Sequence, residues 1–162
     1  MKNFLTSCRC PIIRGFLSLF LTATALTGCA QSSKNNNLNS KNMKAIEINK
    51  ADFLTKVANI ETSPKEWKYL GDKPAIVDFF ATWCGPCRAL APVLEEVAGE
   101  YGDSLNVYKI DVDKEEELAS FFGIRSIPTL LFIPMQGNPQ MVVGGMAKSD
   151  LKKVIDNTLL KK

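Results

Sequence analysis

Apolar side chains follow two different periods on either side of one short turn. Residues 75–80 form an apolar run with a single acidic residue, which predicts a buried β-strand. From Cys87 onward, apolar side chains recur every three or four residues, which places them on one face of a helix that reaches Tyr101 and ends at Gly102. The chain is therefore predicted to pass from a strand into a helix within a few residues.

The same patterns predict the other elements of one α/β domain. Apolar runs predict strands over 45–48, 105–111, 129–133 and 140–143, with a hairpin turn at 136–139. Helical spacing and polar N-cap residues predict helices that begin after Asn49, Asp113 and Ser149, and residues 62–71 are predicted to be a loop. This order predicts a central mixed sheet of about five strands, with about four helices on both of its faces.

Residues 1–28 have the pattern of a targeting segment. Three basic residues precede an apolar stretch over 15–28, which is too short to span a membrane comfortably as a permanent helix. The stretch leads into the sequence LTGC, which is similar to the lipobox of bacterial lipoproteins and ends at Cys29. That similarity implies cleavage before Cys29 and acylation of this cysteine. The alternatives are an ordinary signal peptide with an incidental cysteine, or translation from Met43.

The composition of the chain changes after residue 28. Residues 29–44 are rich in Asn, Ser and Lys, so they are predicted to form a flexible linker before a domain at 45–162. The formal charge of +3 arises in the leader, which holds three of the 20 basic residues and none of the 17 acidic ones. The remainder is neutral, and a neutral domain does not favour nucleic acid as a partner.

Two cysteines, Cys84 and Cys87, occupy the predicted turn and the first turn of the helix. The free N–H groups and the dipole of a helix N-terminus lower the pKa of a thiol, so Cys84 is expected to be reactive and exposed. A zinc site would need about four Cys or His ligands, and the chain has no histidine. A purely structural disulfide would gain little from closing so short a loop. Redox chemistry is therefore the favoured interpretation.

The residues around this pair resemble the thioredoxin family. The sequence WCGPC at 83–87 and the sequence Ile-Pro-Thr at 127–129 carry the resemblance, which extends over about 46–160. It implies the thioredoxin fold and dithiol–disulfide exchange with disulfide-bonded client proteins, without a cofactor or a metal. It also implies that Cys84 is the nucleophile and Cys87 the resolving thiol.

Two further positions match polar residues of that family. Asp78 lies in the middle of the predicted strand, so burial should raise its pKa and keep it protonated near neutral pH. The resemblance implies that Asp78 moves a proton to and from the resolving thiol. The alternative is a structural carboxylate held by backbone N–H groups. Lys109 matches the family lysine near that aspartate, although it also fits an ordinary solvent-facing strand lysine.

Several positions are implied by the resemblance to contact substrates. Pro128 matches the family's cis-proline, which packs opposite the cysteines, and Ile127 before it offers backbone groups to an extended substrate. The residues expected to form this docking surface are Trp83, Gly85, Pro86, Ile127, Pro128 and Gly145.

The leader and the redox turn together predict a membrane-anchored oxidoreductase that reduces protein disulfides on the periplasmic side of a bacterial envelope. A reductant there needs electrons from across the membrane, so a transmembrane thiol–disulfide carrier is the expected partner, and a monomer is the expected state. One alternative is a thiol oxidase or isomerase, because that compartment tends to hold thiols oxidised. The others are a reductase for cytochrome c maturation and, from a different class, a non-enzymatic binding or assembly module.

Overall fold

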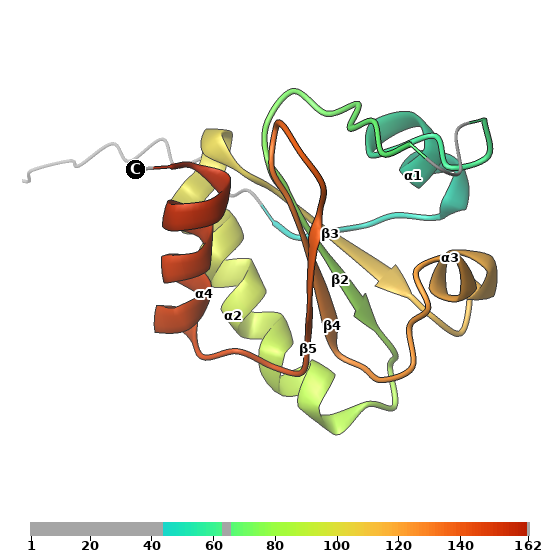
Figure 1. The fold of residues 1–162 in the computed structure, drawn as a ribbon. Coiled ribbons are helices and arrows are strands. Elements are labelled where there is room, and N and C mark those ends of the chain that lie inside the picture. Colours follow the sequence, from blue (N-terminus) through green and yellow to red (C-terminus); the bar gives the residue numbers. More distant parts are fainter. Residues whose placement is uncertain (1–43, 63–65, 162) are drawn as a thin grey trace, which may run out of the picture. The chain divides into compact units, whose positions relative to one another are not determined.

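The computed structural model describes residues 44–62 and 66–161, and the predicted leader, Cys29 and nearly all of the predicted linker lie outside them. Within the described residues, five strands form a mixed sheet in the order β1-β3-β2-β4-β5 (Figure 1). The pairs β1–β3 and β2–β3 are parallel, whereas β2–β4 and β4–β5 are antiparallel. The strands are β1 (Ile46–Glu47), β2 (Ala75–Phe80), β3 (Asn106–Asp111), β4 (Thr129–Ile133) and β5 (Gln140–Val143).

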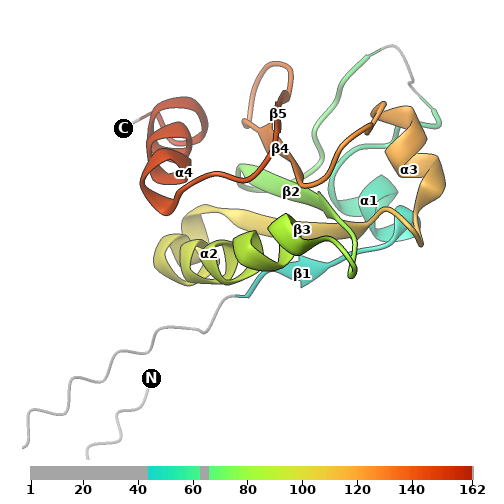
Figure 2. The same ribbon diagram turned by 90° about the horizontal axis from the view of Figure 1, so that it is seen from below.

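Helices cover both faces of the sheet, as Figures 1 and 2 show, which confirms the predicted α/β architecture. One face carries α1 (Lys50–Lys56) and α3 (Glu116–Phe121), and the other carries α2 (Gly85–Tyr101) and α4 (Lys148–Val154). A short 3-10 turn, η1 (Gly102–Ser104), follows α2, and a π-helical turn, η2 (Ile155–Leu159), extends α4. None of the helices in the described part of the chain is long and apolar enough to cross a membrane.

The side chains of β2 alternate between these two faces, because successive residues of a strand point to opposite sides. Val77 and Phe79 pack with Phe53 of α1 on one face. Ile76 packs with α2 and α4 on the other face. Asp78 lies on the same side as Ile76, so the fold places a carboxyl group inside the layer that α2 covers.

The helix α2, which follows the Cys-x-x-Cys turn, forms as its sequence predicts. One side of it is buried against the sheet, and that side comprises Cys87, Leu90, Leu94, Val97 and Ala98. The helix ends at Gly102, whose positive φ of 43° suits glycine because it has no Cβ. The N-cap of α1 is Asn49, as predicted, and its side chain accepts the N–H of Asp52.

Two of the predicted helix caps are wrong. The N-cap of α3 is Glu115 instead of Asp113, and the N-cap of α4 is Ala147 instead of Ser149. Neither observed N-cap makes a side-chain hydrogen bond to its helix. The burial of apolar side chains beneath these short helices therefore fixes where they begin, because packing contributes more to a short helix than a single cap does.

Candidate active site

A disulfide joins Cys84 and Cys87 at the point where β2 leads into α2. Their Cα atoms are 5.3 Å apart. Both side chains are buried in a small cluster with Ala81, against which Phe80 and Ile127 pack. The pair follows the carboxyl end of β2, which is the central strand of the sheet. The adjacent strand β3 runs parallel to β2, so its carboxyl end lies at the same edge.

Cys84 is the N-cap of α2, and its Sγ atom accepts a hydrogen bond from the backbone N–H of Cys87 at 3.2 Å. The carbonyl of Cys84 accepts the N–H of Arg88, also at 3.2 Å, which closes the first turn of the helix. In the reduced protein, this N–H group and the positive end of the helix dipole favour a thiolate on Cys84.

The prediction that Cys84 is solvent-exposed is wrong for the disulfide form. Cys84 is 4% exposed and Cys87 is 2% exposed, so the two sulfur atoms are almost equally covered. The sulfur atoms are covered because they pack in one cluster with Ala81, and Phe80 and Ile127 lie against that cluster. The turn exposes its neighbours Trp83, Gly85 and Pro86 instead.

The structure brings the predicted substrate-contact residues together around the disulfide. The peptide bond between Ile127 and Pro128 is cis, as expected. The carbonyl oxygen of Ile127 lies 3.8 Å from Cys84 Sγ. The carbonyl of Pro128 accepts the N–H of Gly144 at 2.8 Å, which places the neighbouring Gly145 beside the same loop.

Asp78 is buried, as predicted, with 1% of its surface exposed. Neither carboxylate oxygen has a hydrogen-bond partner among the described residues, so backbone N–H groups there do not hold it. Burial raises the pKa of Asp78 from 3.8 to about 7, and the positive charge of Lys109 lowers it in part. Lys109 is the register partner of Asp78 on β3, and its ammonium lies 4.8 Å from the centre of the Phe80 ring.

Asp78→Asn is expected to stabilise the protein at alkaline pH. Between about pH 4 and 7 the native state keeps a proton on Asp78 that the unfolded chain has released, so wild-type stability falls as pH rises and the loss is complete above pH 7. The shift from 3.8 to about 7 corresponds to at most about 4 kcal/mol. Urea unfolding of the disulfide form at pH 4, 6 and 8 measures the difference in free energy of unfolding between Asp78→Asn and wild type.

The difference between Asp78→Asn and wild type should be smallest at pH 4 and largest at pH 8. Lys109→Met is the complementary variant, since removal of the ammonium should move the wild-type transition to higher pH. A stability difference that is the same at all three pH values would show that the Asp78 carboxyl group does not titrate in this range.

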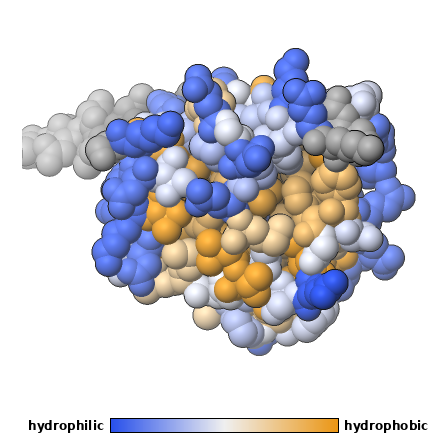
Figure 3. All heavy atoms as spheres, viewed as in Figure 1, coloured by the Kyte–Doolittle hydropathy of each residue, from blue (hydrophilic) through white to orange (hydrophobic). Residues whose placement is uncertain are grey.

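Apolar side chains on β5 extend the surface beside the cysteines. Val143 is 63% exposed and Met141 is 41% exposed, whereas Val142 between them packs toward α2 and α4. Figure 3 shows apolar surface over β5 and toward α3, beside the hydrophilic side chains over α4. Val143 pairs with Thr129, immediately after the cis-proline. Val143 was not among the predicted contact residues, and its place in the strand predicted over 140–143 was the available signal.

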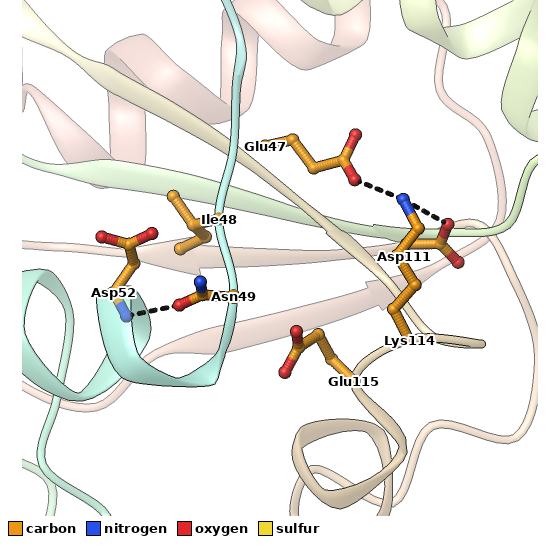
Figure 4. A pocket seen from close by; sticks show the side chains of 7 residues that line it. All are labelled: Glu47, Ile48, Asn49, Asp52, Asp111, Lys114 and Glu115. Carbon is orange, nitrogen blue, oxygen red and sulfur yellow. Dashed lines mark hydrogen bonds and ion pairs between the residues drawn. The ribbon is translucent and has the colours of Figure 1, made fainter.

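A cavity of about 270 Å³ holds none of the predicted site residues (Figure 4). It lies between β1, the start of α1 and the loop before α3, and its lining comprises Glu47, Ile48, Asn49, Asp52, Asp111, Lys114 and Glu115. Lys114 pairs with Glu47 and Asp111 across it. Within 44–62 and 66–161, no group of His, Cys, Asp and Glu side chains is arranged to hold a metal ion.

Comparison with known proteins agrees with this geometry. The sequence profile of the thioredoxin family matches residues 44–157. The thioredoxin of Borreliella burgdorferi is 42% identical over 111 residues, which cover 68% of this chain and 94% of that thioredoxin. The thioredoxin of Alicyclobacillus acidocaldarius is 45% identical over 55% of this chain and 85% of its own length. The crystal structure of chloroplastic thioredoxin z superposes with a TM-score of 0.58 at 30% identity, covering 70% of this chain and 93% of that one.

The matched range, 44–157, spans the Cys84–Cys87 turn, the buried Asp78 and the cis-proline Pro128. A Cys-x-x-Cys pair at a helix N-terminus reduces disulfides by dithiol–disulfide exchange. The chain therefore belongs to the thioredoxin family and is a thiol–disulfide oxidoreductase of the protein-disulfide reductase type.

Proposed function

We propose that this thioredoxin reduces the disulfides of proteins outside the cytoplasm, while a lipid on Cys29 anchors it to the membrane. One observation carries the proposal: the family match begins only at residue 44, behind a basic and apolar leader that runs into LTGC. Several acyl chains on one cysteine, at about 0.8 kcal/mol for each buried CH₂ group, would anchor the domain durably.

The proposed reaction transfers two electrons in two exchange steps. The Cys84 thiolate attacks one sulfur atom of the client disulfide, forms a mixed disulfide and releases the other client sulfur as a thiolate. The Cys87 thiol then loses its proton and attacks Cys84 Sγ. This second step re-forms the Cys84–Cys87 disulfide and releases the second client thiolate, so the client is reduced and the thioredoxin is oxidised.

Asp78 is the proposed acceptor for the Cys87 proton. Its pKa of about 7 allows it to bind and release a proton near neutral pH. Asp78 and α2 lie on the same side of the sheet, and Cys87 belongs to the buried side of that helix. Lys109, on the adjacent strand, lowers the proton affinity of Asp78 through its positive charge.

Clients are proposed to dock as extended segments on the rim around the disulfide. We call this rim, which comprises Trp83, Gly85, Pro86, Ile127, Pro128 and Gly145, the docking rim. Its exposed residues are Trp83, Gly85, Pro86 and Gly145, and Ile127 places a carbonyl group beside Cys84 Sγ. A backbone group at that distance could guide a client strand toward the nucleophile.

The electron donor is proposed to be a transmembrane thiol–disulfide carrier, because a reductant outside the cytoplasm must be supplied across the membrane. The domain is proposed to act as a monomer. Each exchange step needs only one docking rim and one disulfide, both of which a single chain provides.

Two features favour a reductant over an oxidant. A strong dithiol oxidant is one whose reduced form is stabilised. Here one backbone N–H group, that of Cys87, donates to Cys84 Sγ in the described structure. The intervening Gly85 and Pro86 add no polar side chain, and the chain has no histidine to stabilise a thiolate.

The reduction potential of the Cys84–Cys87 pair tests this preference. Equilibration with glutathione or dithiothreitol buffers is expected to give a reduction potential of about −270 mV, which is typical of thioredoxins. A value near about −120 mV would instead assign the protein to the thiol oxidases. Selective activity toward a haem-binding client would favour the cytochrome c maturation alternative.

A further inference from the structure

The Trp83 indole combines high exposure with a fixed hydrogen bond. It is 67% exposed, more than any other large apolar side chain among the described residues. Its Nε1–H group donates to Oδ2 of Asp113 at 2.7 Å. The sequence predicted that Asp113 would cap α3, whereas its carboxylate accepts the indole N–H instead. An exposed side chain otherwise samples several rotamers, so this bond restricts the orientation of the indole.

Asp113 is itself held by a buried carboxylate. Its backbone N–H donates to Oδ1 of Asp111 at 3.1 Å, and Asp111 is 3% exposed. The other oxygen of Asp111 pairs with Lys114 at 3.4 Å, and Lys114 also binds Glu47 at 2.8 Å. Figure 4 shows the Lys114 ammonium between these two carboxylates. The loop that carries Asp113 is thus tied to β3 and, through Glu47, to β1.

The same loop is also tied to the strand that leads to the cysteines. The N–H group of Val112 donates to the carbonyl of Phe80 at 2.9 Å, at the end of β2. Asp113 follows Val112, and Trp83 lies three residues after Phe80. The parallel pairing of β2 and β3 therefore sets the distance between the carboxylate and the indole.

We propose that Asp113 is a positioning residue, whose carboxylate holds the Trp83 indole in the orientation that receives a protein client on the docking rim. This inference rests on the proposed docking role of the rim. Without Asp113, the indole would have to be ordered each time a client binds, and that ordering would weaken binding. The thiol exchange at Cys84 would be unaffected once the client is in place, so the loss should fall on KM and not on kcat.

Steady-state reduction of insulin by the full-length chain tests the proposal. Asp113→Ala and Trp83→Phe each break the same bond from opposite ends, and Phe keeps an aromatic ring. Each is expected to raise KM about three- to tenfold, with kcat within about twofold of wild type. The double variant should be no worse than either single variant, because both remove one interaction.

Two matched variants separate the hydrogen bond from the charge. Asp113→Asn keeps an oxygen that can accept the indole N–H, so its KM should return close to the wild-type value. Glu116→Ala removes a neighbouring exposed carboxylate that is not bonded to Trp83, and its KM should equal that of wild type.

The indole N–H resonances give a direct reading of the contact. The chain has two tryptophans, so the spectrum of the disulfide form contains two indole N–H peaks. Asp113→Ala should move the Trp83 peak and speed its exchange with solvent. The Trp67 peak should stay in place, because Trp67 Nε1 is buried and has no hydrogen-bond partner among the described residues, Asp113 included.

The Asp113 and Trp83 variants distinguish a failure of the positioning role of Asp113 from a failure of the docking role of the rim. An unshifted Trp83 peak in Asp113→Ala, or a shifted peak with an unchanged KM, would overturn the positioning role. If Trp83→Ala still raised KM, the docking rim would survive that result. An unchanged KM in Trp83→Ala would overturn the docking role of Trp83 together with the inference. Should Asp113→Ala fail to fold, Trp83→Phe tests the same bond with the loop intact.

Discussion

Cys84→Ser is expected to lower the rate of insulin reduction to that of dithiothreitol alone. A serine hydroxyl is not ionised near neutral pH, so it cannot attack a disulfide even though it can still accept the N–H of Cys87 as an N-cap. Because the cap is retained, the loss should reflect chemistry and not a misplaced helix. Turbidity of reduced insulin, with dithiothreitol as the electron source, measures the rate. A Cys84→Ser variant that keeps the full rate would show that this sulfur is not the nucleophile.

Cys87→Ser is the matched variant, and it should accumulate mixed disulfides with clients instead of simply losing activity. The two sulfur atoms are almost equally buried in the disulfide form, so exposure does not decide which one attacks. The position at the helix terminus does, because Cys84 receives the N–H bond and lies beside the Ile127 carbonyl. Non-reducing gels and intact mass detect the trapped species. Equal trapping by Cys84→Ser and Cys87→Ser would mean that the nucleophile has been misassigned.

Cys29→Ala is expected to release the protein from membranes or to leave it unprocessed with its leader attached. The chain after the leader is neutral, so without acyl chains it has no net positive charge to bind an anionic bilayer strongly. Membrane fractionation and intact mass measure the two outcomes. The purified variant should still reduce insulin, because the Cys84–Cys87 pair is complete without a third cysteine.

Cys84→Ser provides the control for that experiment, since it also removes one sulfur atom but should leave the protein on the membrane. A mature protein without acyl mass would overturn the lipid anchor and the location that depends on it. A disulfide between Cys29 and Cys84 would do the same, because an acylated sulfur is a thioether and cannot exchange.

Much of the fold could be predicted because its signals are local. The apolar run of β2 and the helical spacing of α2 each lie within one short segment, and so does the turn that places Cys84 at the helix N-terminus. The cap of α1 and the glycine that ends α2 are likewise properties of neighbouring residues. Burial of Asp78, and with it a raised pKa, also follows from the sequence, because a strand that is apolar on both sides is a central strand.

The helix caps show where local signals stop being sufficient. Asp113 is as good an N-cap as sequence rules can offer, but a cap contributes only about 1 kcal/mol. The carboxylate of Asp113 instead accepts the Trp83 indole N–H, and its backbone N–H donates to the buried Asp111. Both contacts depend on the pairing of β2 with β3, which no pattern within one segment contains.

The surroundings of the two sulfur atoms were likewise decided by tertiary structure. Local patterns in the sequence predicted the Cys84–Cys87 turn, the helix after it and the strand before it. Such patterns do not show that Ile127, 43 residues from Cys84, brings its carbonyl to 3.8 Å from Sγ, or that this loop helps to bury the sulfur. Exposure and contact across such distances depend on strand register and on how loops close over the sheet, so they are set only when all the strands have paired.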